Sequence, residues 1–439
     1  MSQPLHDAIQ EGVDAMRVCL DGGANVDGPD ARGWTPLDAA CRAGHVDAVM
    51  LLLDRGADCD RPGPYPGTTP LIVTCGSGHV DAARLLLDRG ADVDRPQQDG
   101  ATPLIIACQE NQFEAATLCL DRGADVKKVT EHGCSPLFIA SQSGHADLVM
   151  LCIGRGGEVD RAAVDGATAL YVACQNGYGD VATLLLDHGA DVKRTTNNSD
   201  QGGWAPLHAA CLNNHVDLVR LCLDRGAEVN QAAQLGFTPF YLACQEGHVS
   251  CARLCLARGA GADRATLQGV SPLHAACWEG HIDTARLALE HGADINRILL
   301  MSASAAAGES PQDIARNRGH ATMAAWLSRV RVLGWTRHLS EPRYKLVVLR
   351  ELVARERARR ERALPGKELV LNFLFPGDQP PPRATKQAKR GPRLPDELFS
   401  VIARYYWCGE PSAEEEAAAA AERAATAAAA EEAPEQDAE

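Results

Sequence analysis

The chain has 439 residues, 45% of them hydrophobic, and this length and apolar content exclude a protein that is disordered throughout. Its 43 Lys and Arg against 58 Asp and Glu give a formal net charge of -15, which argues against non-specific nucleic-acid binding along most of the surface. Residues 1–12 lack a basic start followed by an apolar run, and no segment approaches the roughly 18 apolar residues of a membrane helix. We therefore expect an intracellular protein, in the cytoplasm, with the nucleus as a second candidate location.

One sequence block recurs along most of the chain with a period of 33 residues. Each copy begins with Gly-x-Thr-Pro-Leu or a near copy, and its prolines occupy positions 36, 70, 103, 136, 206, 239 and 272. A short helix, a Gly-His pair, a Leu-rich helix and a closing Asp-Arg-Gly-Ala-Asp-Val follow in turn. Self-similarity at this period is typical of a solenoid, in which each unit buries its apolar face against its neighbours.

The block contains the signals that begin and end two helices. Thr35 is predicted to cap the first helix through its hydroxyl, and Pro36 fits the first helical position, where no N-H is needed. Gly44 and Gly56 lie where the helices should end with a positive φ. The apolar stripe left for neighbouring repeats to cover comprises Leu37, Ala40, Val49, Leu52 and Leu53.

This block resembles the ankyrin repeat, with its Thr-Pro-Leu-His, Gly-His and Gly-Ala-Asp-Val-Asn signatures, from about residue 4 to 330. The resemblance implies an all-α solenoid of about ten helix-turn-helix units with β-hairpin loops. The first unit, 5–27, is truncated, and the last, 310–327, carries Gln312, Arg316 and Arg318 as a water-facing cap. Insertions at 198–203 and 298–308 lengthen two hairpins and are interpreted as recognition fingers.

The cysteines and histidines recur at fixed repeat positions, so we interpret them as structural. The cysteines expected in the core are Cys41, Cys75, Cys108, Cys174, Cys211, Cys244 and Cys277 on first helices, with Cys119, Cys152, Cys222 and Cys255 on second helices. Cys251 and Cys255 share a helical face but lack further ligands at zinc-site spacing, so no metal is expected. Neither a phosphate loop nor a nucleophile elbow nor a paired-carboxylate pattern stands outside the repeat. We therefore expect no enzyme and no cofactor.

A protein partner is expected to bind at the hairpin tips and at the ends of the first helices, which line the concave side in the ankyrin fold. The predicted tip residues are Arg32, Trp34, Tyr65, Asp99, His132, Trp204 and Phe237. The predicted helix-end residues are Arg42, Gln109, Glu110, Gln142, Gln175, Asn176, Asn213, Gln245, Glu246, Trp278 and Glu279. Aromatic anchors among amides suit protein binding, and the acidic trend favours a basic partner. The alternative is that the Gln residues are solvated helix ends repeated by duplication.

The composition changes after residue 330. Residues 331–393 hold 16 basic and 6 acidic residues, whereas 394–439 hold 2 basic and 12 acidic residues. We predict a solenoid at 1–330, a basic helical extension at 331–378, a Pro/Lys-rich linker at 379–393, a short helix at 394–409 and an acidic Ala/Glu-rich disordered tail at 410–439. The basic run has two interpretations, a solvated helix and a nuclear-import or nucleic-acid segment.

Residues 394–407 resemble the opening helix of an F-box, the segment that binds a ubiquitin-ligase adaptor in that family. The matching positions are Leu394, Pro395, Glu397, Leu398, Ile402 and Tyr405. A full F-box continues for some thirty residues, whereas here an Ala/Glu tract soon follows. Two functions are therefore considered: a non-enzymatic scaffold or adaptor that binds a protein, and a substrate receptor that also recruits ligase components. The adaptor-binding residues of the second would be Leu394, Pro395, Leu398, Ile402 and Tyr405.

Overall fold

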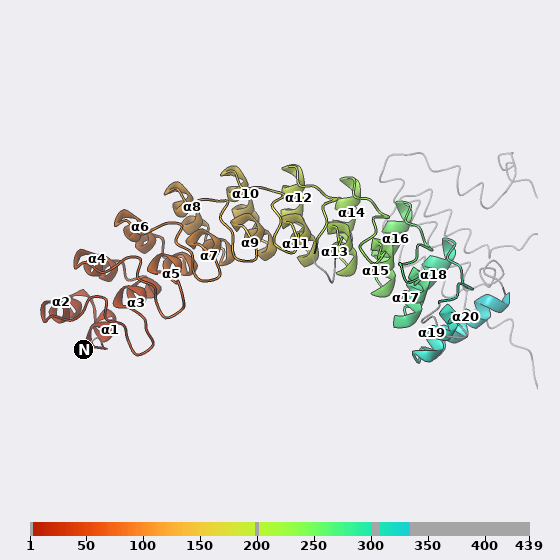
Figure 1. The fold of residues 1–439 in the computed structure, drawn as a ribbon, viewed down its shortest axis with the longest axis horizontal. Coiled ribbons are helices and arrows are strands. Elements are labelled where there is room, and N and C mark those ends of the chain that lie inside the picture. Colours follow the sequence, from red (N-terminus) through yellow and green to blue (C-terminus); the bar gives the residue numbers. More distant parts are fainter. Residues whose placement is uncertain (1–2, 198–201, 300–307, 334–439) are drawn as a thin grey trace, which may run out of the picture. The chain divides into compact units, whose positions relative to one another are not determined.

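The structure is a computed structural model that describes residues 3–197, 202–299 and 308–333 (Figure 1). The chain divides into two compact units, 1–324 and 325–439. Most of the second unit lies outside the described residues, and so do the predicted extension, linker, F-box-like helix and tail beyond residue 333. The predicted domain boundaries, including the one at residue 330, therefore stay predictions.

Twenty α-helices make up the described ranges, and they form ten consecutive pairs. The first helices of the pairs are α1 (Gln3–Glu11), α3 (Pro36–Ala43), α5 (Pro70–Ser77), α7 (Pro103–Gln109), α9 (Pro136–Ser143), α11 (Ala169–Asn176), α13 (Pro206–Leu212), α15 (Pro239–Gln245), α17 (Pro272–Glu279) and α19 (Pro311–Asn317). The second helices are α2 (Val13–Asp21), α4 (Val46–Asp54), α6 (Val80–Asp88), α8 (Phe113–Asp121), α10 (Ala146–Gly154), α12 (Gly179–Asp187), α14 (Val216–Asp224), α16 (Val249–Ala257), α18 (Ile282–Glu290) and α20 (Ala321–Leu333). The expectation of an all-α solenoid of ten two-helix units is confirmed.

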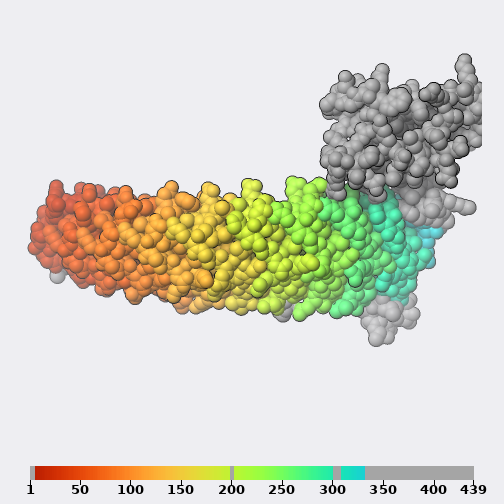
Figure 2. Space-filling model, turned by 90° about the horizontal axis from the view of Figure 1, so that it is seen from above, coloured from red at the N-terminus to blue at the C-terminus, as the bar shows by residue number. Residues whose placement is uncertain are grey.

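Within residues 3–324, first helices stack on first helices and second helices stack on second helices. Figure 1 shows the two rows, with the loops between repeats extending past the row of first helices. Figure 2 shows side chains of successive repeats packed in sequence order along the visible face. Each repeat therefore touches only its neighbours, as expected for a solenoid.

The predicted helix starts are confirmed by capping geometry. The Asp38 amide donates to Thr35 Oγ1 at 3.0 Å, while the Asp38 carboxylate accepts from the Thr35 amide, which completes a capping box. Ala205 has no hydroxyl, and there His208 Nδ1 accepts the amide hydrogen of Ala205 at 3.1 Å instead. The sequence thus finds two chemical solutions for the same helix start.

The predicted glycine positions are also confirmed, and they do more than end helices. Gly44 has φ 69° and Gly56 has φ 84°, both in the left-handed region. A Cβ at Gly44 would lie 2.7 Å from the His79 ring, whereas a Cβ at Gly56 would meet nothing within 4 Å. The first glycine therefore also makes room for the ring of the next repeat.

Cysteines at the repeated positions are buried, as predicted. All of those expected in the core have no solvent-exposed surface, and Cys251 is equally buried. Burial is the largest cause that raises the pKa of Cys41, Cys244 and Cys277 above the usual range of a thiol. These thiols stay protonated and pack as small apolar groups.

An ion-pair ladder that was not predicted from the sequence links the second helices. The last Asp of one second helix pairs with the Arg that follows the next second helix. The rungs are Asp21–Arg55 at 2.9 Å, Asp54–Arg89 at 2.7 Å, Asp88–Arg122 at 2.8 Å, Asp121–Arg155 at 2.8 Å, Asp187–Arg225 at 2.8 Å and Asp224–Arg258 at 2.6 Å. At two rungs both partners are replaced together. Gly154 and His188 take the places of Asp and Arg in one rung, and Ala257 and His291 take them in the other.

A second ladder joins the loops that follow the second helices. The Asp160 carboxylate accepts from the Asp191 amide at 3.0 Å, and the same bond recurs elsewhere in the array. Where Lys193 replaces the accepting Asp, the next repeat carries Glu228, and the two form an ion pair at 3.0 Å. Lys127 and Glu158 repeat this exchange at 3.3 Å. Both sequence variants thus preserve a bond between neighbouring repeats.

Candidate partner-binding surface

The loops that connect the repeats are hairpin turns closed by backbone hydrogen bonds. In the loop before α9, the Thr130 amide donates to Cys134 O at 3.1 Å and the Gly133 amide donates to Thr130 O at 2.8 Å. These loops were expected to be β-hairpins, but no extended strand forms in the described ranges, where one isolated bridge joins Leu299 and Glu309. The turns are too short for a ladder, because only one or two bonds close each of them.

Adjacent hairpin tips are bonded to one another, which fixes their spacing. Six bonds of one kind run from a tip amide to the carbonyl of the preceding tip: Gln98 to Pro66 at 3.0 Å, Glu131 to Asp99 at 2.7 Å, Val164 to His132 at 2.8 Å, Asn197 to Asp165 at 2.8 Å, Gln234 to Gly202 at 2.9 Å, and Leu267 to Leu235 at 2.9 Å. The tips therefore form a connected row rather than independent loops, and their side chains project from a shared backbone support.

Of the predicted tip residues, the N-terminal aromatic pair comes together. The Trp34 and Tyr65 rings meet edge to face with centroids 5.7 Å apart, and the Arg42 guanidinium lies 5.0 Å from the Trp34 ring centroid. Tyr65 remains 64% exposed. This cluster joins two predicted tips and one predicted helix end, and it offers an exposed aromatic face.

Trp204 is the one buried residue of the predicted set. It was predicted to be a partner-binding tip residue, and it is 9% exposed. Its ring stacks on His208 with an interplanar angle of 25°, and its amide donates to Thr196 Oγ1 at 3.2 Å. Trp204 therefore belongs to the base of the lengthened loop, whose residues 198–201 lie outside the described ranges.

Other aromatic residues of the set are half-buried. The Phe237 ring lies 5.1 Å from the Tyr241 ring, centroid to centroid. Trp278 lies beneath the guanidinium of Arg318, whose central carbon is 3.3 Å from the ring centroid. Both side chains are partly exposed, so both can contribute apolar area to a contact.

The predicted helix-end residues are mostly exposed, and several are bonded locally. Gln109 Nε2 donates to Glu110 Oε1 at 3.0 Å, and Gln245 Nε2 donates to Glu246 Oε1 at 3.1 Å. Asn176 Nδ2 donates to the backbone carbonyl oxygen of Gln142 at 2.9 Å, and the Gln142 side chain itself is exposed to solvent. The exposed predicted residues are Arg32, Arg42, Tyr65, Asp99, Gln109, Glu110, His132, Gln142, Gln175, Asn176, Asn213, Glu246 and Glu279; Gln245 is half-buried. We use "rim surface" for the predicted tip and helix-end residues without Trp204.

The recurring histidines support the helix ends, as the structural interpretation predicted. Ring Nε2 donates to the last carbonyls of the preceding first helix: His79 to Arg42 O at 3.2 Å, His215 to Gln175 O at 3.1 Å, His248 to Leu212 O at 2.9 Å and His320 to Trp278 O at 2.9 Å. His208 is more deeply buried, and desolvation lowers its pKa to about 4. These rings therefore fix the backbone at the ends of the first helices, which carry the helix-end residues of the rim surface.

Charge on the rim surface is unevenly distributed. Its exposed carboxylates are Asp99, Glu110, Glu246 and Glu279, and the exposed Glu131 and Asp165 lie on adjoining tips. Its basic groups, Arg32 and Arg42, lie near the N-terminal end of the array. The middle and C-terminal repeats therefore offer a mainly acidic surface.

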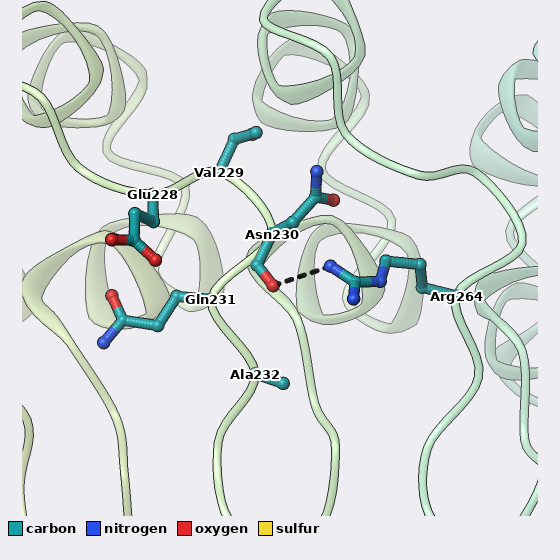
Figure 3. A pocket seen from close by; sticks show the side chains of 6 residues that line it. All are labelled: Glu228, Val229, Asn230, Gln231, Ala232 and Arg264. Atoms are coloured by element: carbon teal, nitrogen blue, oxygen red, sulfur yellow. Dashed lines mark hydrogen bonds between the residues drawn. The ribbon is translucent and has the colours of Figure 1, made fainter.

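Two shallow hollows lie away from the rim surface. One, of about 630 Å³, is lined by Glu228, Val229, Asn230, Gln231, Ala232 and Arg264 (Figure 3). There Arg264 Nη1 donates to Asn230 O at 3.0 Å, so the guanidinium holds neighbouring loops together. The other, of about 370 Å³, lies between α8 and α10 and is lined by Phe113, Asp147, Met150 and Leu151. Neither contains a residue of the predicted set.

The described residues contain no group of three or more His, Cys, Asp or Glu side chains arranged to hold a metal ion. Among the helices of the same ranges, none combines the length and the hydrophobicity that a membrane crossing requires.

The stacked helix pairs, the linked tips and the exposed rim define a repeat protein of the kind that binds macromolecules through an extended surface. The family model described as "Ankyrin repeats (3 copies)" matches residues 2–63, 59–130, 117–196, 137–233 and 207–298. Together these matches span well over half of the chain. The chain belongs to the ankyrin-repeat family.

Similarity to individual proteins is confined to short stretches. Human protein phosphatase 1 regulatory subunit 27 is 37% identical over 57 residues, which are 13% of this chain and 37% of that protein. Mouse DNA-binding protein RFXANK is 41% identical over 54 residues, 12% of this chain and 20% of that protein. Mouse 2-5A-dependent ribonuclease is 48% identical over 60 residues, 13% and 8% respectively. The matched stretches thus span between 8% and 37% of the length of these relatives.

Among solved structures, the human ASB11 ankyrin-repeat domain is 28% identical to the chain. The match covers 52% of this chain and 98% of that domain, with a TM-score of 0.47.

Proposed function

We propose that the chain is a non-enzymatic scaffold or adaptor that binds a protein partner through the rim surface. The observation that carries the proposal is that some positions of each repeat serve folding and others remain available for binding. Residues that recur in the core and at the helix ends are occupied by caps, packing and bonds between repeats, whereas the tip residues differ from repeat to repeat. The rim residues remain mostly exposed, although Gln recurs at the helix end in four repeats. Ankyrin repeats are typically interaction modules rather than catalysts, and one of the relatives is named as a regulatory subunit.

The partner that fits best has a basic contact surface. Carboxylates dominate the rim surface in the middle and C-terminal repeats, and exposed opposite charges speed encounter and select partners. The aromatic cluster of Trp34, Tyr65 and Arg42 would supply buried apolar area at the other end.

Two charge-matched variants of the full chain test this assignment. The rim variant combines Glu110→Arg, Glu246→Arg and Glu279→Arg. The control variant combines Glu114→Arg, Asp217→Arg and Asp283→Arg, which are exposed carboxylates on second helices. Wild type and both variants, each checked for helicity by circular dichroism, are used for affinity capture from lysate with quantitative mass spectrometry.

A partner that is captured by wild type and by the control variant, but lost by the rim variant, supports the proposal. A partner lost only by the control variant would place binding on the second helices and would overturn it. If both variants lose the partner at low salt while wild type retains it, binding depends on the net charge of the chain and not on a defined surface.

The ubiquitin-ligase receptor is a second candidate, and it rests on the F-box-like sequence at 394–407, outside the described residues. Under this hypothesis, Leu398→Asp with Ile402→Asp should abolish the capture of ligase components and leave the rim partner bound. Capture unchanged by the two substitutions would reject this role for the segment.

A further inference from the structure

Four pairs of cysteines meet inside the array, and each pair spans two neighbouring repeats. The Sγ–Sγ distances are 3.5 Å for Cys75 and Cys119, 3.9 Å for Cys108 and Cys152, 3.7 Å for Cys174 and Cys222, and 3.7 Å for Cys211 and Cys255. In every pair, the first cysteine lies on a first helix and the second lies on the second helix of the next repeat. We propose that these pairs are sites of oxidative modification, which a hydroperoxide converts into disulfides that join adjacent repeats.

The closed array protects the thiols. All eight side chains have no exposed surface. The neighbouring thiol and burial both raise the pKa of Cys75, Cys108, Cys174 and Cys211 well above the usual value, so these groups stay neutral and unreactive. Reaction therefore begins when two repeats separate locally, as repeat arrays do at a free energy below that of global unfolding.

The chemistry balances with one hydroperoxide molecule per pair. In the opened interface, one thiolate sulfur attacks the O–O bond, which breaks and leaves a sulfenic acid and a water or alcohol molecule. When the repeats close, the partner sulfur attacks the sulfenic sulfur, an S–S bond forms and the S–O bond breaks, releasing water. The two thiols lose two protons and two electrons, and the peroxide takes them up.

The same array contains equivalent interfaces that lack one or both thiols. In these interfaces, the two positions that hold a cysteine pair elsewhere are occupied by Cys41 and Leu86, by Ser141 and Leu185, and by Cys244 and Ala288. These interfaces supply substitutions that already occur in this chain at the same place in the repeat. Cys119→Leu copies Leu86, and Cys255→Ala copies Ala288.

The test treats the reduced full chain with hydrogen peroxide at urea concentrations below its unfolding midpoint, where repeats open locally. The dose is the one that consumes the half-exposed thiols of Cys59 and Cys134. Remaining thiols are blocked with N-ethylmaleimide, and disulfides are mapped by peptide mass spectrometry. We expect the four predicted linkages, and we expect the urea midpoint to rise and to return after treatment with dithiothreitol.

Variants make the assignment specific. Cys119→Leu should leave Cys75 free and keep the other three linkages, and Ala288→Cys should add a linkage to Cys244. Full labelling of Cys75, Cys108, Cys174 and Cys211 by N-ethylmaleimide at that dose would overturn the proposal. Linkages scattered among other cysteines, or restricted to contacts between molecules, would overturn it as well.

Discussion

The interfaces between repeats and the rim surface use the same ten units in opposite ways. Between repeats, equivalent residues recur or change in pairs, as when Asp and Arg give way to Gly154 and His188, or when Lys193 meets Glu228. At the tips of the rim surface, equivalent positions carry different side chains, such as Arg32, Asp99 and His132. Repetition in the interfaces therefore marks the residues needed for stacking, and variation at the tips marks residues available for a partner.

The largest effect that separates the two regions should come from the core. Leu170→Ala removes a side chain on α11 that has no exposed surface, and it should lower the free energy of unfolding by about 2–5 kcal/mol. Gln175→Ala, at an exposed position of the same helix, should stay within about 0.5 kcal/mol of wild type. Urea unfolding followed by circular dichroism measures both, and equal losses would contradict the division.

Acid should weaken the interfaces through His208. Its pKa is about 4 in the fold and about 6.5 when exposed, so the unfolded chain binds more protons between these values. Stability should therefore fall as the pH drops from 6.5 to 4, by roughly 3 kcal/mol from this residue at 1.36 kcal/mol per pKa unit.

Carboxylates titrate over the same range, so the comparison is between wild type and His208→Gln, which cannot gain a proton. Urea unfolding of both chains at pH 7 and pH 4 gives the difference. The variant should lose less stability on acidification, and identical losses would show that His208 is not held neutral in the fold.

Two glycines distinguish backbone strain from contact between repeats. Gly156→Ala should cost about 1 kcal/mol, because φ is 87° and a Cβ would meet nothing within 4 Å. Gly144→Ala carries similar strain at φ 80°, and its Cβ would also lie 2.7 Å from the Tyr178 ring. In thermal or urea unfolding, Gly144→Ala should therefore have a free energy of unfolding about 1 kcal/mol lower than that of Gly156→Ala.

The Tyr178→Ala background provides the control for this pair. It should remove the additional cost at Gly144 and leave the cost at Gly156 unchanged. If Gly144→Ala costs no more than Gly156→Ala in the wild-type chain, the ring contact does not restrict this position.

The smallest expected effect concerns the ion-pair ladder. A double-mutant cycle of Asp121→Ala and Arg155→Ala should give a coupling energy of about 0.2–1 kcal/mol, because both groups are partly exposed. Gly154→Asp combined with His188→Arg should create the missing rung, with a coupling of the same size. The cycles are measured by urea unfolding at low and high salt, and coupling that persists unchanged in high salt would contradict an electrostatic origin.

Much of the fold follows from local chemistry that can be read in the sequence. Thr35, Pro36 and Gly44 specify helix ends through caps and φ preferences, and the repeated cysteines and histidines indicate their structural roles by recurring. Bonds between tips could not be predicted, because they depend on how two loops distant in sequence approach each other. The thiol pairs escaped notice for the same reason, since each joins helices of different repeats.

The site was predicted less completely than the fold. Trp34 and Trp204 follow the same glycine of the repeat, yet Trp34 is half-buried beside Tyr65 and Trp204 is buried against His208. Position in the repeat places a residue near a tip, but its neighbours decide how much of its side chain is exposed. The signal for Trp204 was the histidine four residues later, a flat group on which an indole can stack.

Photo-cross-linking tests the rim assignment most directly. A benzophenone amino acid replaces Gln142 at the end of α9 in one full chain, and Met150 on α10 of the same repeat in another; both side chains are exposed. After irradiation with the captured partner, we expect a covalent adduct from position 142 and none from position 150. An adduct from position 150 alone would contradict it and would place the partner on the second helices.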